Sequence, residues 1–181
     1  MKNVRKTVTV ILCTHKYIEY AEQQIKSIKN QINVNIKIII SIDSKEKDTF
    51  LDWKLLVKKY FNDGDFQIVY GPMKGFSENF LSTLVNLDKT TDYYSFSDHD
   101  DIWDEDKLYC AIEKIKNYDN SIPLLYGSRS RYIDNKNRYI SLSNDITCET
   151  SFSNSLVQCF AGGNTMLFNN CLLKIIKKIG F

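Results

Sequence analysis

The stretch Tyr93–Leu108 reads YYSFSDHDDIWDEDKL, and the interpretation of the whole chain starts from it. Its aromatic first part, Tyr93–Ser97, is typical of a buried strand, because such residues pack well on a pleated surface. Six acidic residues follow before Lys107. Carboxylates crowded at the mouth of a buried strand raise one another's pKa unless a cation is present. The stretch therefore indicates a calcium loop, an acidic helix start, or a site for a metal ion and phosphate.

The spacing of the acidic residues excludes a calcium loop of the EF-hand type. Such a loop starting at Asp98 would need an oxygen ligand, a glycine and a glutamate at its fifth, sixth and twelfth positions. The residues at those positions are Ile102, Trp103 and Tyr109.

A helix start explains only the second half of the acidic cluster. Asp104–Asp106 fit the first turn of a helix, where negative side chains interact favourably with the helix dipole. Asp98, Asp100 and Asp101 lie before that turn, at the end of the strand. Hard divalent cations prefer oxygen ligands and commonly bridge to substrate phosphates. These three carboxylates therefore indicate a site for a metal ion and a diphosphate.

Strand and helix patterns alternate along the first two thirds of the chain. The expected strands are 7–13, 35–42, 66–70 and 92–97, each rich in β-branched or aromatic residues. Four helices are expected between and after these strands, the first at Tyr17–Asn30. The second is capped by Asp48 and carries Leu51, Leu55 and Tyr60 on one face, and the third is capped by Ser77 and carries Phe80, Leu84 and Leu87. The fourth is capped by Asp104 and carries Leu108, Ala111, Ile112 and Ile115. This order predicts an α/β fold, a Rossmann-like, mostly parallel sheet with helices on both faces.

The pattern changes after residue 121. Short strands with a turn at 134–137 predict a small extra β segment near the C-terminus, and an irregular polar loop follows at 144–155. The residues 162–170 fit a glycine-flanked turn into a strand, and 169–181 fit an amphipathic helix. We expect residues 1–181 to form a single domain, because the chain is long enough for one sizeable core.

Composition narrows the class of protein. The net charge is +2, from 24 Lys and Arg against 22 Asp and Glu, so bulk electrostatics indicate no nucleic-acid partner. Five cysteines without a C-x-x-C pair, and only two histidines, argue against a structural zinc site and favour reduced thiols in the cytoplasm. The apolar run 7–13 is too short for a transmembrane helix and fits a first strand better than a signal peptide.

Three polar segments follow the first, second and fourth expected strands: Thr14–Lys16, Asp43–Asp48 and Asp98–Asp101. In open α/β sheets, ligands bind beyond the carboxyl ends of the strands. We therefore expect these segments to converge into one binding site although they lie far apart in the sequence.

The acidic segment FSDHDDIWDEDKL resembles the D-x-D segment of family-two inverting glycosyltransferases of the GT-A fold, and is most similar to their rhamnosyltransferase-like branch. Other segments resemble that family in the same order. They are VTVILCTHKYIEYAEQQIKSIKNQ at 8–31, IIISIDS at 38–44, GFSENF at 75–80 and AGGNTMLFNN at 161–170. The ordered similarity therefore covers nearly the whole chain.

The resemblance implies a role for each matching residue on the nucleotide side. Asp98 would contact the ribose or diphosphate of a nucleoside-diphosphate sugar, and Asp100 would be the principal ligand of Mn²⁺ or Mg²⁺, with Asp101 as a further ligand or its support. Asp43 would accept a hydrogen bond from a pyrimidine base. Thr14 and His15 would line the base pocket, although a surface turn remains an alternative for His15. Asn79 would belong to the same nucleotide-sugar-binding set.

Two neighbours of the acidic segment have simpler interpretations. Trp103 fits a packing residue beneath the site, and Lys107 fits a solvated helix face better than a phosphate contact. On the acceptor side, the resemblance places Gly163, Asn164 and Thr165 beside the acceptor and the donor sugar. Residues 1–121 would then form the nucleotide-sugar-binding half, and residues 122–181 part of the acceptor-binding half.

The implied reaction is inverting transfer of a sugar, such as rhamnose, from a UDP- or dTDP-sugar to a surface polysaccharide or lipid-linked glycan. Such transfer needs a general base, which the family carries after the helix that follows the acceptor turn. We therefore expect the base beyond Phe181, and a C-terminally truncated chain. The acceptor would bring the protein to the inner face of the membrane, and the apolar side of the last helix predicts a homodimer.

Two alternatives remain at this stage. The first is an inactive nucleotide-sugar-binding or assembly module that keeps the fold without the general base. The second is a nucleotidyltransferase, which also holds Mg²⁺ with acidic residues on an α/β sheet. Nucleotidyltransferases normally carry a glycine-rich phosphate loop after the first strand, and the segment CTHKYIEY has no glycine.

Overall fold

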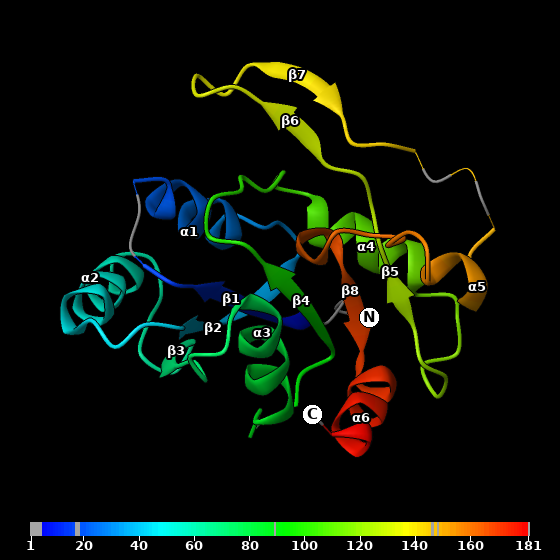
Figure 1. Ribbon diagram of the computed structural model, residues 1–181, viewed down its shortest axis with the longest axis horizontal. Helices are drawn as coiled ribbons and strands as arrows, with labels where there is room; N and C mark the ends of the chain where they lie inside the picture. Colours follow the sequence, from blue (N-terminus) through cyan, green and yellow to red (C-terminus); the bar gives the residue numbers. More distant parts are fainter. Residues whose placement is uncertain (1–4, 17–18, 89, 146, 148, 181) are drawn as a thin grey trace.

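The structure is a computed structural model, and it describes all residues except 1–4, 17–18, 89, 146, 148 and 181. Its main sheet has six strands in the order β3-β2-β1-β4-β8-β5 (Figure 1). β1, β2, β3 and β4 run parallel, whereas β8 runs antiparallel to both β4 and β5. The strands are β1 Lys6–Thr14, β2 Val34–Ile42, β3 Phe66–Tyr70, β4 Tyr93–Ser97, β5 Leu125–Tyr126 and β8 Leu167–Asn169. The predicted mostly parallel α/β sheet is therefore confirmed.

Helices cover both faces of this sheet. α1 Ala21–Lys29, α2 Lys47–Lys58 and α4 Lys107–Ile115 share a core cluster on one face. α3 Phe76–Val85 and α6 Asn170–Ile179 share the cluster on the other face, where Figure 1 shows them side by side. Both faces of β1 are consequently buried, as is typical of a central parallel strand.

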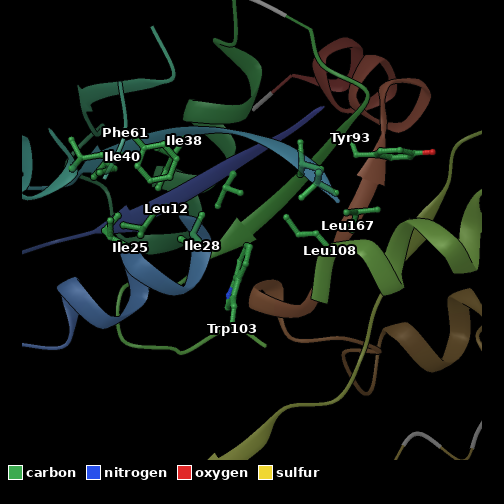
Figure 2. Packing of buried hydrophobic residues seen from close by; sticks show 14 of the residues in the cluster. Leu12, Ile25, Ile28, Ile38, Ile40, Phe61, Tyr93, Trp103, Leu108 and Leu167 are labelled. Carbon is green, nitrogen blue, oxygen red and sulfur yellow. The ribbon is translucent and has the colours of Figure 1, made fainter. Parts of the chain in front are cut away.

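Alternating side chains of β1 enter the two clusters in turn. Val10 and Leu12 pack with α1 and α4, and Ile11 packs with α3. Figure 2 shows Leu12 beside Ile25 and Ile28 of α1. Each fully buried aliphatic side chain contributes about 1.5–3 kcal/mol to folding, so this central strand fixes the position of the helices around it.

The stripe predicted for α4 is confirmed, since Leu108, Ala111, Ile112 and Ile115 are its buried residues. The face predicted for α2 is wrong. Leu51 and Leu55 are 54% and 57% exposed, and the buried stripe is Thr49, Trp53, Leu56 and Val57. The large Trp53 side chain is buried completely, and its position turns the two leucines toward solvent.

Two predicted helix caps are also wrong. Asp48 lies inside α2, whose N-cap is Glu46, and Ser77 lies inside α3, whose N-cap is Gly75. Gly75 has φ = +94°, a conformation that favours glycine, so the backbone begins this helix without a capping hydroxyl. α1 begins at Ala21 rather than Tyr17, which lies outside the described residues.

The C-terminal part follows the predicted pattern. The strands β6 Arg131–Ile133 and β7 Tyr139–Leu142 form a hairpin around the expected turn at 134–137, and Figure 1 shows it projecting from the main sheet. A short helix, α5 Phe152–Ser155, ends the segment that was expected to be irregular. A 3-10 turn at Gly163–Thr165 then leads into β8, as predicted.

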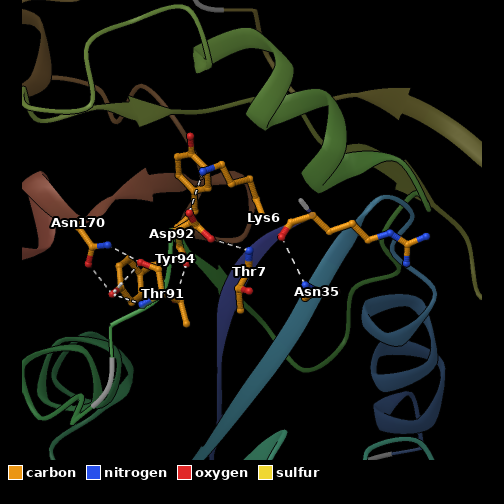
Figure 3. Close-up of polar contacts among 9 residues, drawn as sticks. Lys6, Thr7, Asn35, Thr91, Asp92, Tyr94 and Asn170 are labelled. Atoms are coloured by element: carbon orange, nitrogen blue, oxygen red, sulfur yellow. Dashed lines mark hydrogen bonds and ion pairs between the residues drawn. The ribbon is translucent and has the colours of Figure 1, made fainter. Parts of the chain in front are cut away.

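Hydrogen bonds fix the amino end of the sheet, opposite the polar segments. Asp92 accepts from the Lys6 ammonium and from the backbone N–H of Thr7, both at 2.9 Å (Figure 3). The Tyr94 hydroxyl donates to Asn170 Oδ1 at 2.7 Å. These bonds join β1, the start of β4 and α6 at the end of the sheet opposite the polar segments.

Candidate functional site

A cleft of about 640 Å³ opens beyond the carboxyl end of β4. Asp100 and Asp101 line it from the acidic segment, and Asn164 and Thr165 line it from the turn before β8. Lys107 at the start of α4 lies in the same cleft. Two segments about sixty residues apart therefore converge here, so residues predicted for the metal and for the acceptor side share one cavity.

Direct hydrogen bonds connect these segments. The Asn164 amide donates through Nδ2 to Asp101 Oδ2 at 2.6 Å. The Lys107 ammonium donates to the Asn164 carbonyl at 2.8 Å and lies 3.5 Å from the centre of the Trp103 indole. The acceptor-side turn is thus held against the acidic segment.

The prediction that Lys107 lies on a solvated helix face is wrong. Its ammonium folds back over Trp103, and burial lowers the pKa of Lys107 to about 7, although the charge of Asp101 opposes that shift. Trp103 is 5% exposed and belongs to the core cluster, as predicted (Figure 2). The aliphatic stem and ammonium of Lys107 therefore cover the packing residue from the cleft side.

Asp98 lies half-buried at the end of β4. Burial and, to a smaller extent, the charges of Asp101 and Asp100 raise the pKa of Asp98 to about 6. The crowding that the sequence predicted is therefore present. Asp98 is not among the residues that line the cleft, so its contact with a ribose or diphosphate stays a prediction.

The donor set of the cleft fits a hard divalent cation only in part. Among the described residues no group of three His, Cys, Asp or Glu side chains is arranged to hold a metal ion. Asp100 and Asp101 nevertheless face the cleft together, and Mg²⁺ is commonly bound through one or two carboxylates plus substrate phosphates. The residues present thus fit a cation that takes its remaining ligands from the substrate and water.

A second cavity, of about 760 Å³, opens beyond the ends of β1 and β2. His15 and Asp43 line it, together with Lys45 and Met73. His15 Nδ1 lies 2.7 Å from the Asp43 carbonyl oxygen, and buried Thr14 donates its hydroxyl to the Lys16 carbonyl. The segments after the first and second strands therefore converge as expected. The acidic segment after the fourth strand lines the first cleft instead, and the two cavities share no lining residue, so the convergence of all three segments into one site stays a prediction.

Asp43 holds the loop that borders this second cavity, which Met73 and Gly75 line. Its Oδ1 accepts from the backbone N–H of Met73 at 2.5 Å, and its Oδ2 accepts from that of Gly75 at 3.0 Å. Asp43 is 8% exposed. The sequence identified Asp43 correctly as a residue of this edge, but its two loop partners were not predicted.

Asn79 is 1% exposed and bonded through both amide atoms to Ser41, with Oδ1 accepting and Nδ2 donating. It joins α3 to β2 directly beneath the loop, and its contact with a nucleotide stays a prediction. Gly71 was missed by sequence reasoning. A Cβ atom at Gly71 would lie 2.5 Å from Asn79 Oδ1 and 2.7 Å from Asp43 Oδ1, so only glycine allows this close approach.

The hairpin supplies a wall of the first cleft that the sequence also missed, through Arg129, Arg131 and Tyr139. Arg131 forms an ion pair with Asp104. The predicted cap role of Asp104 is therefore wrong: α4 begins at Lys107, with Asp106 as its N-cap. The available signal was the spacing of Arg129 and Arg131, two residues apart in a segment expected to form short strands, although β6 begins only at Arg131.

Comparison with known proteins identifies the family. Residues 9–172 match the family model described as glycosyl transferase family 2. The chain belongs to this family. The match includes both cavities, the acidic segment and the acceptor-side turn.

Among curated proteins, this glycosyltransferase family-2 chain is 33% identical over 95 residues to the dTDP-rhamnosyl transferase RfbG of Shigella flexneri. The match covers 52% of this chain and 33% of RfbG. The chain thus spans about a third of that relative's length.

Solved structures share the GT-A-like fold. A mannosyltransferase from Pyrobaculum calidifontis, PcManGT, in complex with GDP-Man and Mn²⁺, superposes with a TM-score of 0.62 at 13% identity, covering 98% of this chain and 48% of that one. A 4-diphosphocytidyl-2C-methyl-D-erythritol synthase from Anaerococcus prevotii superposes with a TM-score of 0.57 at 17% identity, and the match covers 96% of this chain and 73% of the synthase. At these identities the likeness establishes the fold alone.

None of the helices in the described part of the chain combines the length and the apolar character needed to cross a membrane.

Proposed function

We propose that this chain transfers a sugar, with inversion at the anomeric carbon, from a nucleoside-diphosphate sugar to a growing surface polysaccharide. The donor is a UDP- or dTDP-sugar, and the likeness to RfbG makes dTDP-L-rhamnose the first donor to test. The reaction depends on Mn²⁺ or Mg²⁺. A polysaccharide growing on a lipid carrier places the protein in the cytoplasm, against the inner face of the membrane.

The observation that carries this proposal is the 2.6 Å hydrogen bond between Asn164 and Asp101. It unites the acceptor-side turn and the acidic segment in one cleft, so that an acceptor hydroxyl and a donor diphosphate can meet there. Holding two reactants in position removes much of the entropic part of a bimolecular barrier.

The residues of the cleft have different roles in the proposed transfer. Asp100 and Asp101 would hold the cation, which when bound would neutralise the charge developing on the departing diphosphate. Asn164 fixes the carboxylate of Asp101 and the course of the acceptor-side turn.

Calorimetric titration of UDP and dTDP, each with and without Mn²⁺, tests the donor side. We expect binding that Mn²⁺ strengthens, and Asp100→Ala should weaken the Mn²⁺-dependent binding at least about tenfold, because one of two facing carboxylates is lost. Asp52→Ala, at an exposed position on α2, is the matched control and should bind like the parent chain.

Two results would overturn the proposal. One is absence of binding for both nucleotides under all conditions. The other is unchanged binding after Asp100→Ala. If transfer from a labelled donor is detected, the anomeric configuration of the product separates inversion from retention.

A further inference from the structure

α1 and the residues just after it carry buried polar side chains on the side that contacts the acidic segment. Gln24 is completely buried, Gln31 is 7% exposed, and Ser27 between them is half-buried. These three residues, the polar face of α1, are spaced three and four positions apart, so they lie on one side of the helix and its end. A buried amide costs free energy unless it is hydrogen-bonded, so the partners of these side chains explain why the face is polar.

The first two residues of the polar face hold the start of the acidic segment. Gln24 Nε2 donates to the Ser97 hydroxyl at 2.5 Å, and this hydroxyl donates to the Asp98 carbonyl at 2.8 Å. The Ser27 hydroxyl accepts the backbone N–H of Trp103 at 3.0 Å. The chain is therefore fixed on both sides of the carboxylates that line the cleft.

Gln31 holds the second half of the acidic segment. Its Nε2 donates to the Asp104 carbonyl at 2.6 Å, and its Oε1 accepts the backbone N–H of Leu108 at 2.9 Å. The backbone N–H of Ile32 donates to the Glu105 carbonyl, also at 2.9 Å. One amide thus connects the residues before α4 to the first turn of that helix.

The acidic segment depends on these partners, because its own backbone provides few. Residues 98–104 belong to no helix or strand, so their backbone groups have no ladder of hydrogen bonds. The like charges of Asp98, Asp100 and Asp101 repel one another and favour a more open course of the chain. The hydrogen bonds from the polar face of α1 oppose that opening.

We propose that Gln24, Ser27 and Gln31 are positioning residues of the cation site, which keep the acidic segment in the conformation where Asp100 and Asp101 face the cleft. None of the three lines the cleft, so they act only through the segment. A site with two protein carboxylates needs both of them in place, and a displacement of about 1 Å is enough to weaken a preorganised site. This inference rests on the proposed function, because it concerns the same cation and the same nucleotide.

Calorimetric titration of UDP with and without Mn²⁺ tests the inference, because the strengthening of binding by Mn²⁺ depends on the placement of the carboxylates. Gln31→Ala should reduce this strengthening about threefold to tenfold, the effect of one or two lost hydrogen bonds, while binding of UDP without Mn²⁺ should change less than about twofold. Unchanged strengthening by Mn²⁺ in a folded Gln31→Ala would overturn the inference.

Substitutions of Ser27 give a second test that disturbs the core less, since this residue is only half-buried. Ser27→Ala removes the acceptor of the Trp103 N–H, whereas Ser27→Thr keeps a hydroxyl group. We expect the strengthening by Mn²⁺ to fall in Ser27→Ala and to be retained in Ser27→Thr. Equal values for the two variants would contradict a positioning role.

Asn170→Ala is the matched control for Gln31→Ala. The Asn170 amide also bonds through both of its atoms, to the Tyr94 hydroxyl and the Thr91 carbonyl, but at the opposite end of the sheet. Its substitution should lower the melting temperature and leave the strengthening by Mn²⁺ unchanged. If Asn170→Ala reduces this strengthening as much as Gln31→Ala does, the effect is one of general stability, and the inference fails.

The outcomes separate this inference from the proposed function. If Mn²⁺ does not strengthen UDP binding to the parent chain, the proposed metal dependence fails and takes the inference with it. If Asp100→Ala weakens the Mn²⁺-dependent binding but Gln31→Ala and Ser27→Ala do not, only the inference fails. Thermal unfolding of each variant shows whether the chain is folded, and Ser27→Ala decides the question if Gln31→Ala does not fold.

Discussion

At the scale of single residues, Lys107 shows how burial changes a side chain that looks ordinary in the sequence. Its ammonium lies between the Trp103 indole and the Asn164 carbonyl, and burial lowers the pKa of Lys107 to about 7. The folded chain thus binds fewer protons than the unfolded chain between this value and the ordinary lysine pKa. The stability contribution of Lys107 therefore rises as the pH increases through that window.

We expect this pH dependence to disappear in Lys107→Met, which keeps the packing over Trp103 without the charge. The free energy of unfolding, measured with denaturant from pH 6 to pH 10, should rise with pH more steeply in the parent than in the variant. Near pH 6 the variant should be equal in stability or more stable by about 1 kcal/mol, since a partly desolvated charge is removed. Parallel pH profiles for the two proteins would contradict the prediction.

Site residues could be predicted from the sequence where the chemistry requires a particular type of side chain, but their hydrogen-bond partners could not. The sequence indicated Asp100 and Asp101 because carboxylates clustered after a strand favour a cation. It could not indicate that Asp43 holds the 72–75 loop, because the partners are backbone N–H groups, which the residue types do not distinguish. Gly71 was missed for the same reason: its need for space arises from Asn79 and Asp43, which reach it only in three dimensions.

At the scale of elements, the hairpin β6–β7 touches the start of α4 through the ion pair of Arg131 with Asp104. Both side chains are more than half exposed, at 54% and 57%. Exposed ion pairs contribute roughly 0–1 kcal/mol to the free energy of unfolding. The pair therefore connects the hairpin to the segment before α4 but adds little stability.

A double-mutant cycle distinguishes this pair from the helix cap that the sequence suggested for Asp104. We expect Asp104→Ala and Arg131→Ala to show a coupling energy of about 0.2–1 kcal/mol in denaturant unfolding at low salt, falling as salt screens the pair. If Asp104 acted as a cap, its substitution would cost about 1 kcal/mol with no coupling to Arg131.

The periodicity of the sequence predicted which segments are helices and strands, but it did not predict every buried helix face or helix start. The stripe of α4 is regular, and its buried residues are those expected. In α2 two sets of apolar side chains could form the buried face, one with Leu51 and Leu55 and one with Trp53. The sequence pattern favours the leucines. Trp53 decides the face because it buries more surface than either leucine. Helix starts were misplaced because Glu46 and Gly75 begin helices without a capping side chain.

At the scale of the whole molecule, α6 presents apolar side chains to solvent. Ile175 and Ile179 are 40% and 71% exposed, while Leu173 on the opposite side is buried. We expect two chains to associate through the exposed side of α6, which would remove this apolar surface from water.

Light scattering at high protein concentration should give the molar mass of two chains, and Ile179→Lys should shift it toward one. Leu51→Lys, at an exposed leucine on α2, is the matched control and should leave the association unchanged. A monomer for the parent chain at high concentration would contradict the prediction.

The order of the strands has a consequence for the chain during synthesis. β4 gains its second neighbour only when β8 forms, about seventy residues after Ser97. At about 5–20 residues per second, the aromatic strand keeps one unpaired edge for several seconds on the ribosome. An unpaired edge is a template for pairing with another chain. β8 is thus the strand that closes this edge of the nascent sheet.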